Sequence, residues 1–156
     1  MTKKLLVFTK HFPYNMGETA AESYLETEIG YLAEAFDEVM VIATEAPADR
    51  LPVQRLPENV RSASLGCVQT KGEKAACLVV GLTSADARAR EAVAAESILS
   101  ARERAFQCYF AGKALRKWRK LVPVLEGAGF IPTWVYSFWL YDTALMAVWA
   151  KQAYPC

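Results

Sequence analysis

The sequence predicts an α/β fold, a Rossmann-like parallel sheet with helices on both faces. Two short apolar runs, Leu5–Phe8 and Glu38–Thr44, lack polar alternation, which is typical of strands covered on both faces. A helical apolar pattern lies between them, and a strand–helix–strand unit forms a right-handed parallel crossover by default. The chain has 156 residues, of which 53% are hydrophobic, enough for one domain with a buried core.

The first strand is expected to end near Thr9 or Lys10, because Pro13 cannot extend a hydrogen-bonded ladder. Gly17 indicates a shaped loop, and Thr19 with Glu22 has the spacing of a helix capping box. Apolar residues then recur at helical intervals, namely Leu25, Ile29, Leu32 and Phe36. The loop and the helix start therefore lie at the carboxyl end of a parallel strand, where open α/β sheets bind ligands.

The middle of the chain is predicted to be mainly helical. Residues 45–59 contain three prolines and are interpreted as a surface loop, and residues 60–65 as a short third strand. Residues 71–121 are rich in alanine, arginine and glutamate, which favour helix. The sequence does not decide whether the helical pattern after residue 84 is one helix or two, broken near residues 96–100.

The last third returns to a strand–helix pattern. Thr133–Phe138 is predicted to be a buried fourth strand, and Asp142 to lie at the start of a helix that continues through Trp149. A doubly wound sheet ordinarily continues with further strands. We therefore expect residues 1–156 to be a single domain whose sheet is incomplete.

Charge is unevenly distributed, although the net charge is only +1 and indicates no nucleic-acid partner. Residues 1–60 carry five Lys/Arg against ten Asp/Glu, whereas residues 61–120 carry twelve against five. The densest basic segment is Arg116, Lys117, Trp118, Arg119 and Lys120. It is compatible with cations at a helix C-terminus and Trp118 in the core, which we favour, or with contact at a membrane surface.

Several chemistries are disfavoured by missing motifs. The cysteines, at positions 67, 77, 108 and 156, lack zinc-ligand spacing, so we predict reduced thiols and no metal site. No P-loop, no G-x-G-x-x-G after the first strand and no G-x-S-x-G elbow is present. No export signal or apolar run of transmembrane length is apparent. We expect a cytoplasmic protein, peripheral at the inner face of the membrane if the basic segment is an anchor.

Two separated segments resemble one family. The loop Phe12–Thr19 (FPYNMGET) is followed by Glu26–Leu32 (ETEIGYL), and Val135–Ala147 reads VYSFWLYDTALMA. These segments resemble the F-P-x-x-x-G-E loop, the E-x-E-I-x-Y-L helix and the Y-S-x-W-x-x-D-x-A-L segment of GT-B glycosyltransferases that build bacterial capsular and exopolysaccharides. The helical middle of the chain, roughly Leu65 to Lys120, has no such motif.

The resemblance implies a division of labour between two Rossmann-like domains. The N-terminal domain holds a saccharide or lipid-linked acceptor, and the C-terminal domain binds the nucleotide-sugar donor of a retaining transfer. The donor-side residues would lie beyond Cys156, so the resemblance implies a fragment that lacks its C-terminal domain and is inactive alone. No residue of this chain is assigned a catalytic role, and no cofactor is expected.

Candidate substrate-binding residues lie in the two similar segments. Gly17 matches the turn that borders the donor diphosphate, and its alternative is an ordinary loop glycine. Glu18 and Asp142 could bind sugar hydroxyls or could simply complement helix N-termini. His11 could be a base or a hydroxyl contact, and its alternative, which we favour, is a solvent-exposed or packed histidine. Ser137 and Trp139 follow the fourth strand, where Trp139 could stack on a sugar ring or pack in the core.

A second hypothesis from another class is a self-contained flavodoxin-like binding or scaffold module without catalysis. It predicts a closed, fully covered sheet and a stable monomer. A truncated sheet instead exposes unpaired backbone at an edge, which favours a homodimer or a strand-swapped assembly.

Overall fold

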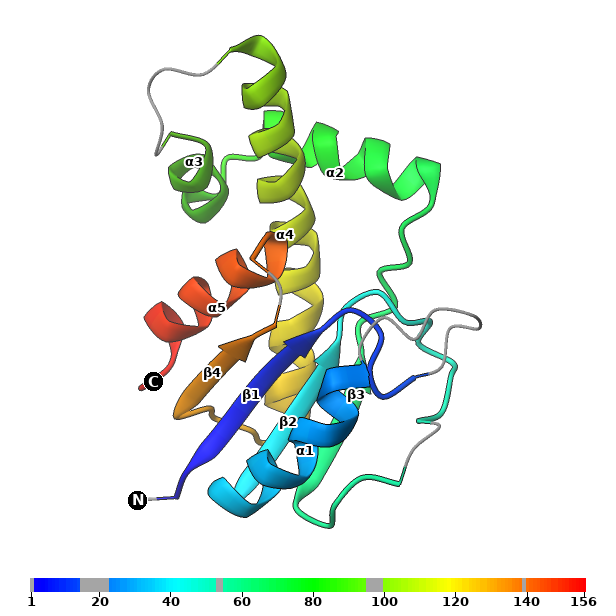
Figure 1. The fold of residues 1–156 in the computed structure, drawn as a ribbon. Helices are drawn as coiled ribbons and strands as arrows, with labels where there is room; N and C mark the ends of the chain where they lie inside the picture. The colour runs from blue at the N-terminus through cyan, green and yellow to red at the C-terminus, as the bar shows by residue number, and fades with distance from the viewer. Residues whose placement is uncertain (1, 15–22, 53–54, 95–99, 139) are drawn as a thin grey trace.

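The computed structural model describes residues 2–14, 23–52, 55–94, 100–138 and 140–156. Four parallel strands form one sheet in the order β3-β2-β1-β4 (Figure 1). Their bounds are β1 Lys4–Thr9, β2 Glu38–Ala43, β3 Val60–Ser64 and β4 Trp134–Ser137. Val7 of β1 aligns with Val41 on one side and Tyr136 on the other. The strands β2 and β3 follow on one side of β1, and β4 pairs with the other side of β1. This parallel sheet with helices on both faces confirms the predicted Rossmann-like α/β class.

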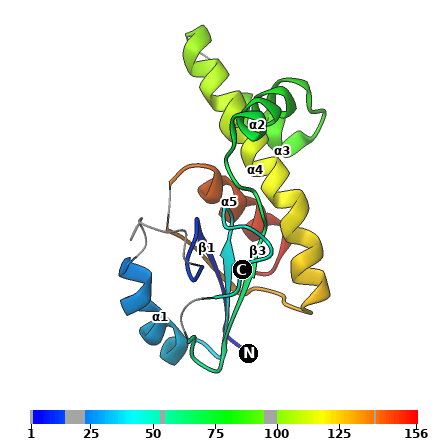
Figure 2. The same cartoon turned by 90° about the vertical axis from the view of Figure 1, so that its right-hand side faces the viewer.

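Alternate residues of the central strands pack into two separate cores. Leu6, Phe8, Met40 and Ile42 face the long helix α4 (Ala101–Gly127) and α5 (Asp142–Ala153). Leu5, Val7, Val39 and Val41 face α1 (Ser23–Ala35). Figure 2 shows α1 on one side of the sheet and α4 on the other. Burial on both faces explains why these strands read as continuous apolar runs.

The prediction that the fourth strand is buried is wrong. β4 lies at an edge of the sheet, and Trp134 is 58% exposed. Beside it lies a groove of about 430 Å³ lined mainly by apolar and aromatic side chains, Leu5, Glu28, Tyr31, Leu32, Phe36, Trp134, Val135 and Tyr136. The β4 side chains on the α1 face are therefore only half covered, and apolar composition alone does not distinguish a central strand from such an edge.

The segment predicted to be helical is confirmed as α2 (Lys71–Thr83), α3 (Ala87–Ala94) and α4. The break in the second half lies between α3 and α4, and Ser100 starts α4 with a capping box to Glu103. The predicted end of the helical segment at residue 121 is wrong, because α4 continues through Pro123 to Gly127. Figures 1 and 2 show α2, α3 and the first half of α4 projecting past the carboxyl ends of the strands.

The basic segment of α4 faces mainly inward. Trp118 is buried, packs edge-to-face on Trp149 with the ring centroids 6.0 Å apart, and lies under the guanidinium of Arg88. Lys117 is 1% exposed. These two side chains therefore cannot contact a membrane surface, and the core alternative for Trp118 is correct. None of the helices described for this chain combines the length and the apolar character needed to cross a bilayer.

Helices α2 and α4 approach each other at two glycines. A Cβ on Gly81 would lie 1.8 Å from the carbonyl oxygen of Cys108, and a Cβ on Gly112 would lie 1.9 Å from that of Cys77. Each helix thus carries a Cys-x-x-x-Gly segment whose glycine meets the cysteine backbone of the other. Only glycine permits this contact, so these positions set the distance between the two helices.

Replacing Gly112 by alanine should force α2 and α4 apart. We expect Gly112→Ala to lower the free energy of unfolding by roughly 1–3 kcal/mol, the usual cost of overpacking, in urea titrations followed by circular dichroism. Gly30→Ala in α1 is the matched control, since nothing lies within 4 Å of the added Cβ. The control should stabilise the protein by about 0.5–1 kcal/mol. Equal effects of the two substitutions would contradict the proposed close contact.

Candidate functional site

The candidate site lies at the carboxyl end of the sheet, where the strand order reverses between β1 and β4. In open α/β sheets this switch point is the usual position of a ligand crevice. Three connections meet there: residues 10–14 after β1, residues 44–46 after β2, and, between β4 and α5, the described residues 138, 140 and 141. The overhanging half of α4 stands above them (Figure 1).

Backbone hydrogen bonds continue beyond the ends of β1 and β2. The Thr44 N–H donates to the Thr9 carbonyl at 3.0 Å, and the Glu45 N–H donates to the Lys10 carbonyl at 2.8 Å. The Thr9 hydroxyl turns the chain by donating to the Phe12 carbonyl at 2.8 Å. Glu45 is thereby held beside the loop that follows β1, although it lies outside the strand itself.

A buried quartet of charges, Glu45, Lys113, Lys117 and Asp142, joins these connections to α4. The Lys117 Nζ lies 2.8 Å from Glu45 Oε1 and 2.6 Å from Asp142 Oδ2. The Lys113 Nζ lies 2.7 Å from Glu45 Oε1 and 3.3 Å from Asp142 Oδ1. Lys117 also donates to the Thr44 hydroxyl at 3.0 Å. The two lysines are one helical turn apart on α4, so both reach the same two carboxylates.

Two members of the quartet, Glu45 and Lys113, are held in their charged forms. Burial alone would raise the pKa of Glu45, but the attraction of Lys117 and the hydrogen bonds from Lys113 and Lys117 outweigh it and lower the pKa to about 2. Burial likewise opposes the charge of Lys113, yet Asp142 and Glu45 raise its pKa above the ordinary value. Glu45 is therefore no general base at neutral pH, and the quartet acts as a charge-balanced clamp.

Aromatic rings form a rim next to the clamp. Tyr141, 55% exposed, stacks on Phe110 with ring centroids 5.1 Å apart and an interplanar angle of 22°. Phe110 also meets Phe106 edge-on, and the Lys113 Nζ lies 5.9 Å from the centre of the Phe110 ring. The rim places exposed ring surface beside the buried charges, where a ligand in the crevice could stack on it.

The structure brings some of the predicted site residues together. His11, half-buried, follows β1, and Ser137, also half-buried, ends the neighbouring β4. The Ser137 hydroxyl lies 3.0 Å from that of Thr143 in α5. Asp142 is 3% exposed and forms ion pairs with Lys113 and Lys117. Its carboxylate therefore holds α4 and α5 together at the carboxyl end of the sheet and does not face solvent. Gly17, Glu18 and Trp139 lie outside the described residues.

Sequence analysis missed three members of the quartet, Glu45, Lys113 and Lys117. A signal was present: the two lysines are spaced i, i+4 within the apolar pattern of α4, and Glu45 directly follows a buried strand. Lysines in such a position suggest buried carboxylate partners, but their identity depends on the tertiary fold. In the described segments no group of three or more His, Cys, Asp or Glu side chains is arranged to hold a metal ion.

Breaking the quartet should be costly. We expect Lys117→Met to lower the free energy of unfolding by roughly 3–5 kcal/mol, because it leaves buried carboxylates with one lysine in place of two. The exposed Arg119→Met on the same helix is the control and should stay within about 0.5 kcal/mol of the parent. Urea unfolding provides the measurement, and a small effect of Lys117→Met would show that the quartet contributes little.

Acid should reveal the contribution of Glu45. Its folded pKa of about 2 lies below the ordinary glutamate value of 4.5, so its stabilising effect is complete above pH 4.5 and is lost as the pH falls toward 2. The shift corresponds to a contribution on the order of 3 kcal/mol. The difference in unfolding free energy between the parent and Glu45→Gln should therefore shrink across this pH range. A constant difference from pH 6 to pH 2 would contradict the assignment.

Comparison with known proteins does not identify the chain. No protein-family model, no curated protein and no solved structure matches it.

Proposed function

We propose that the chain is the acceptor-side domain of a nucleotide-sugar-dependent glycosyltransferase. In this proposal it holds a saccharide or lipid-linked acceptor at the carboxyl end of its sheet. A separate nucleotide-sugar-binding domain supplies the donor. Residues 1–156 alone bind the acceptor and do not transfer sugar.

The proposal is carried by the spatial proximity of the two family-like segments. One begins at β1 and the other spans β4 and α5, more than one hundred residues later in the sequence. β1 and β4 are hydrogen-bonded neighbours, and the Phe138 N–H donates to the Phe8 carbonyl at 3.4 Å. Segments that resemble the same family for a shared ligand should lie close together, and described parts of these two, Phe12–Tyr14 and Val135–Phe138, lie at the ends of neighbouring strands, which supports the proposal.

The chemistry of the edge suits a neutral saccharide. His11 and Ser137 offer polar groups to hydroxyls, and the Tyr141 ring on Phe110 offers a stacking surface. Both lysines of the quartet are neutralised by Glu45 and Asp142. The quartet thus has no net charge with which to attract a diphosphate, consistent with donor binding by another domain.

The flavodoxin-like alternative is less well supported. It requires a fully covered sheet, whereas β4 is an edge strand with a half-covered face and an exposed Trp134. Such an edge is suited to further pairing, either with another strand or with a second copy of the chain. A light-scattering mass of a dimer would support pairing between copies.

Titration of the isotopically labelled chain tests the proposal. We expect a panel of neutral disaccharides to shift backbone amide resonances of residues 10–14 and 137–143, with dissociation constants in the millimolar range, on the order of −4 kcal/mol. UDP-glucose and GDP-mannose should leave these resonances unchanged. The variants His11→Ala and Ser137→Ala should weaken the effect several-fold, because each removes a polar contact.

Tyr31→Ala is the control for this titration, since Tyr31 is exposed at the groove beside β4, away from the carboxyl edge. It should leave the disaccharide shifts unchanged. Tighter binding of nucleotide-sugars than of disaccharides, or shifts confined to the β4 groove, would contradict the proposed function.

A further inference from the structure

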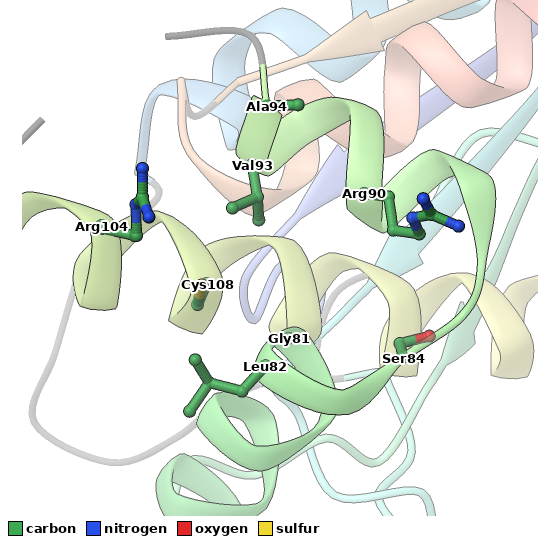
Figure 3. Close-up of a pocket in the computed structure, with 8 residues that line it drawn as sticks. All are labelled: Gly81, Leu82, Ser84, Arg90, Val93, Ala94, Arg104 and Cys108. Carbon is green, nitrogen blue, oxygen red and sulfur yellow. The ribbon is translucent and has the colours of Figure 1, made fainter. Parts of the chain in front are cut away.

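A second cavity lies in the helical overhang, away from the quartet. It has a volume of about 590 Å³ and lies between α2, α3 and α4. Figure 3 shows the residues that line it: Gly81, Leu82, Ser84, Arg90, Val93, Ala94, Arg104 and Cys108. None of them belongs to the candidate acceptor site, so an inference about this cavity does not depend on the proposed function.

The close approach of two helices closes the floor of the cavity. The Cβ missing from Gly81 would overlap the Cys108 carbonyl, so α2 and α4 touch backbone to backbone at this point. The Cys108 side chain is buried. The bottom of the cavity is therefore formed by the backbone contact between Gly81 and Cys108, which also sets the distance between α2 and α4.

One part of the cavity wall is apolar. Leu82 on α2 is 62% exposed, although it lies in a concave region where burial would be favourable. Val93 and Ala94 on α3 complete the apolar wall, and Figure 3 shows Leu82 and Val93 on either side of the opening above Cys108. An occupant with an aliphatic part would bury this surface at about 25 cal/mol per Å².

Two cations border the cavity, and none of the described residues that line it is acidic. Arg104 on α4 and Arg90 on α3 lie on opposite sides of Val93 in Figure 3. Within the described ranges no carboxylate forms an ion pair with either guanidinium, whereas Arg61, Arg88 and Arg116 are each paired. Ser84 adds a hydroxyl at the same rim. The unneutralised positive charge is complementary to an anionic group.

We propose that this cavity binds a phosphorylated lipid. The aliphatic chain lies on Leu82, Val93 and Ala94, and the phosphate lies at the rim, where Arg90 and Arg104 supply positive charge from opposite sides of Val93. Guanidinium groups match phosphate oxygens in geometry and charge. The helical overhang, which has no family-like motif, thereby gains a role of its own.

Dodecyl phosphate, used below the concentration at which it forms micelles, is the probe. Isothermal titration calorimetry should show binding at least tenfold tighter than that of inorganic phosphate, which lacks the chain. It should also be at least tenfold tighter than that of dodecyl maltoside, which has the chain and a neutral head group. Amide shifts on binding should fall in residues 81–94 and 104–108.

Single substitutions test the cationic rim and the apolar wall of the cavity separately. Arg90→Gln and Arg104→Gln should each weaken dodecyl phosphate binding about tenfold, in line with the loss of a hydrogen bond to a charged group. Leu82→Ser should also weaken dodecyl phosphate binding, because it removes an apolar contact with the aliphatic chain of the ligand. Arg119→Gln and Leu51→Ser are the matched controls, because both residues are exposed and neither lines the cavity. Circular dichroism confirms that each variant is folded.

Each outcome decides the inference. If inorganic phosphate bound as tightly as dodecyl phosphate, the aliphatic chain would contribute nothing to binding. If dodecyl maltoside bound as tightly as dodecyl phosphate, the arginines would contribute nothing. Loss of binding in the two controls to the same extent would show non-specific association. Any one of these three results would overturn the proposal. Shifts of residues 10–14 and 137–143 report the acceptor crevice separately, so failure of one proposal is distinguishable from failure of the other.

Discussion

The arrangement at the carboxyl end of the sheet depends on two lysines of α4 that bind two carboxylates. Lys113 and Lys117 each contact both Glu45, which follows β2, and Asp142, which begins α5. The contacts join segments from three parts of the sequence in one buried cluster. Replacement of buried ion pairs by apolar side chains is often neutral or stabilising in other proteins, so stability alone does not account for such a cluster. Its effect is to fix the position of two connections that border the crevice.

The strands and helices that were predicted correctly are those that follow from patterns among neighbouring residues. The strands after Lys4 and Glu38 and the helical character of residues 71–121 follow from apolar runs, proline positions and helix propensity, which are properties of neighbouring residues. The edge position of β4 and the inward direction of Lys117 were not predictable in the same way, because each depends on which element packs against it. Asp142 illustrates the difference. Its place at a helix start could be read locally, but its lysine partners are 29 and 25 residues away.

The helical overhang and the sheet are one structure because α4 belongs to both. Its first half packs on α2 through Gly81 and Gly112, and its second half packs on the sheet through residues such as Leu121 and Leu125. The bidentate pair of Arg116 with Glu73, at 2.9 Å for both hydrogen bonds, adds a further link between α2 and α4. A rigid α4 of 27 residues, roughly 40 Å long, therefore fixes the cavity relative to the crevice.

The charge asymmetry of the sequence has a structural explanation that separates two kinds of basic residue. The cations of residues 113–117 are neutralised internally, by Glu45 from the acidic first part of the chain, by Asp142 and by Glu73. Arg90 and Arg104 have no such ion pair among the described residues and lie at the cavity between α2, α3 and α4. The excess of twelve basic over five acidic residues between positions 61 and 120 is thus not one binding surface. Part of it holds the carboxyl end of the sheet together, part borders the cavity, and part is exposed elsewhere on the helices.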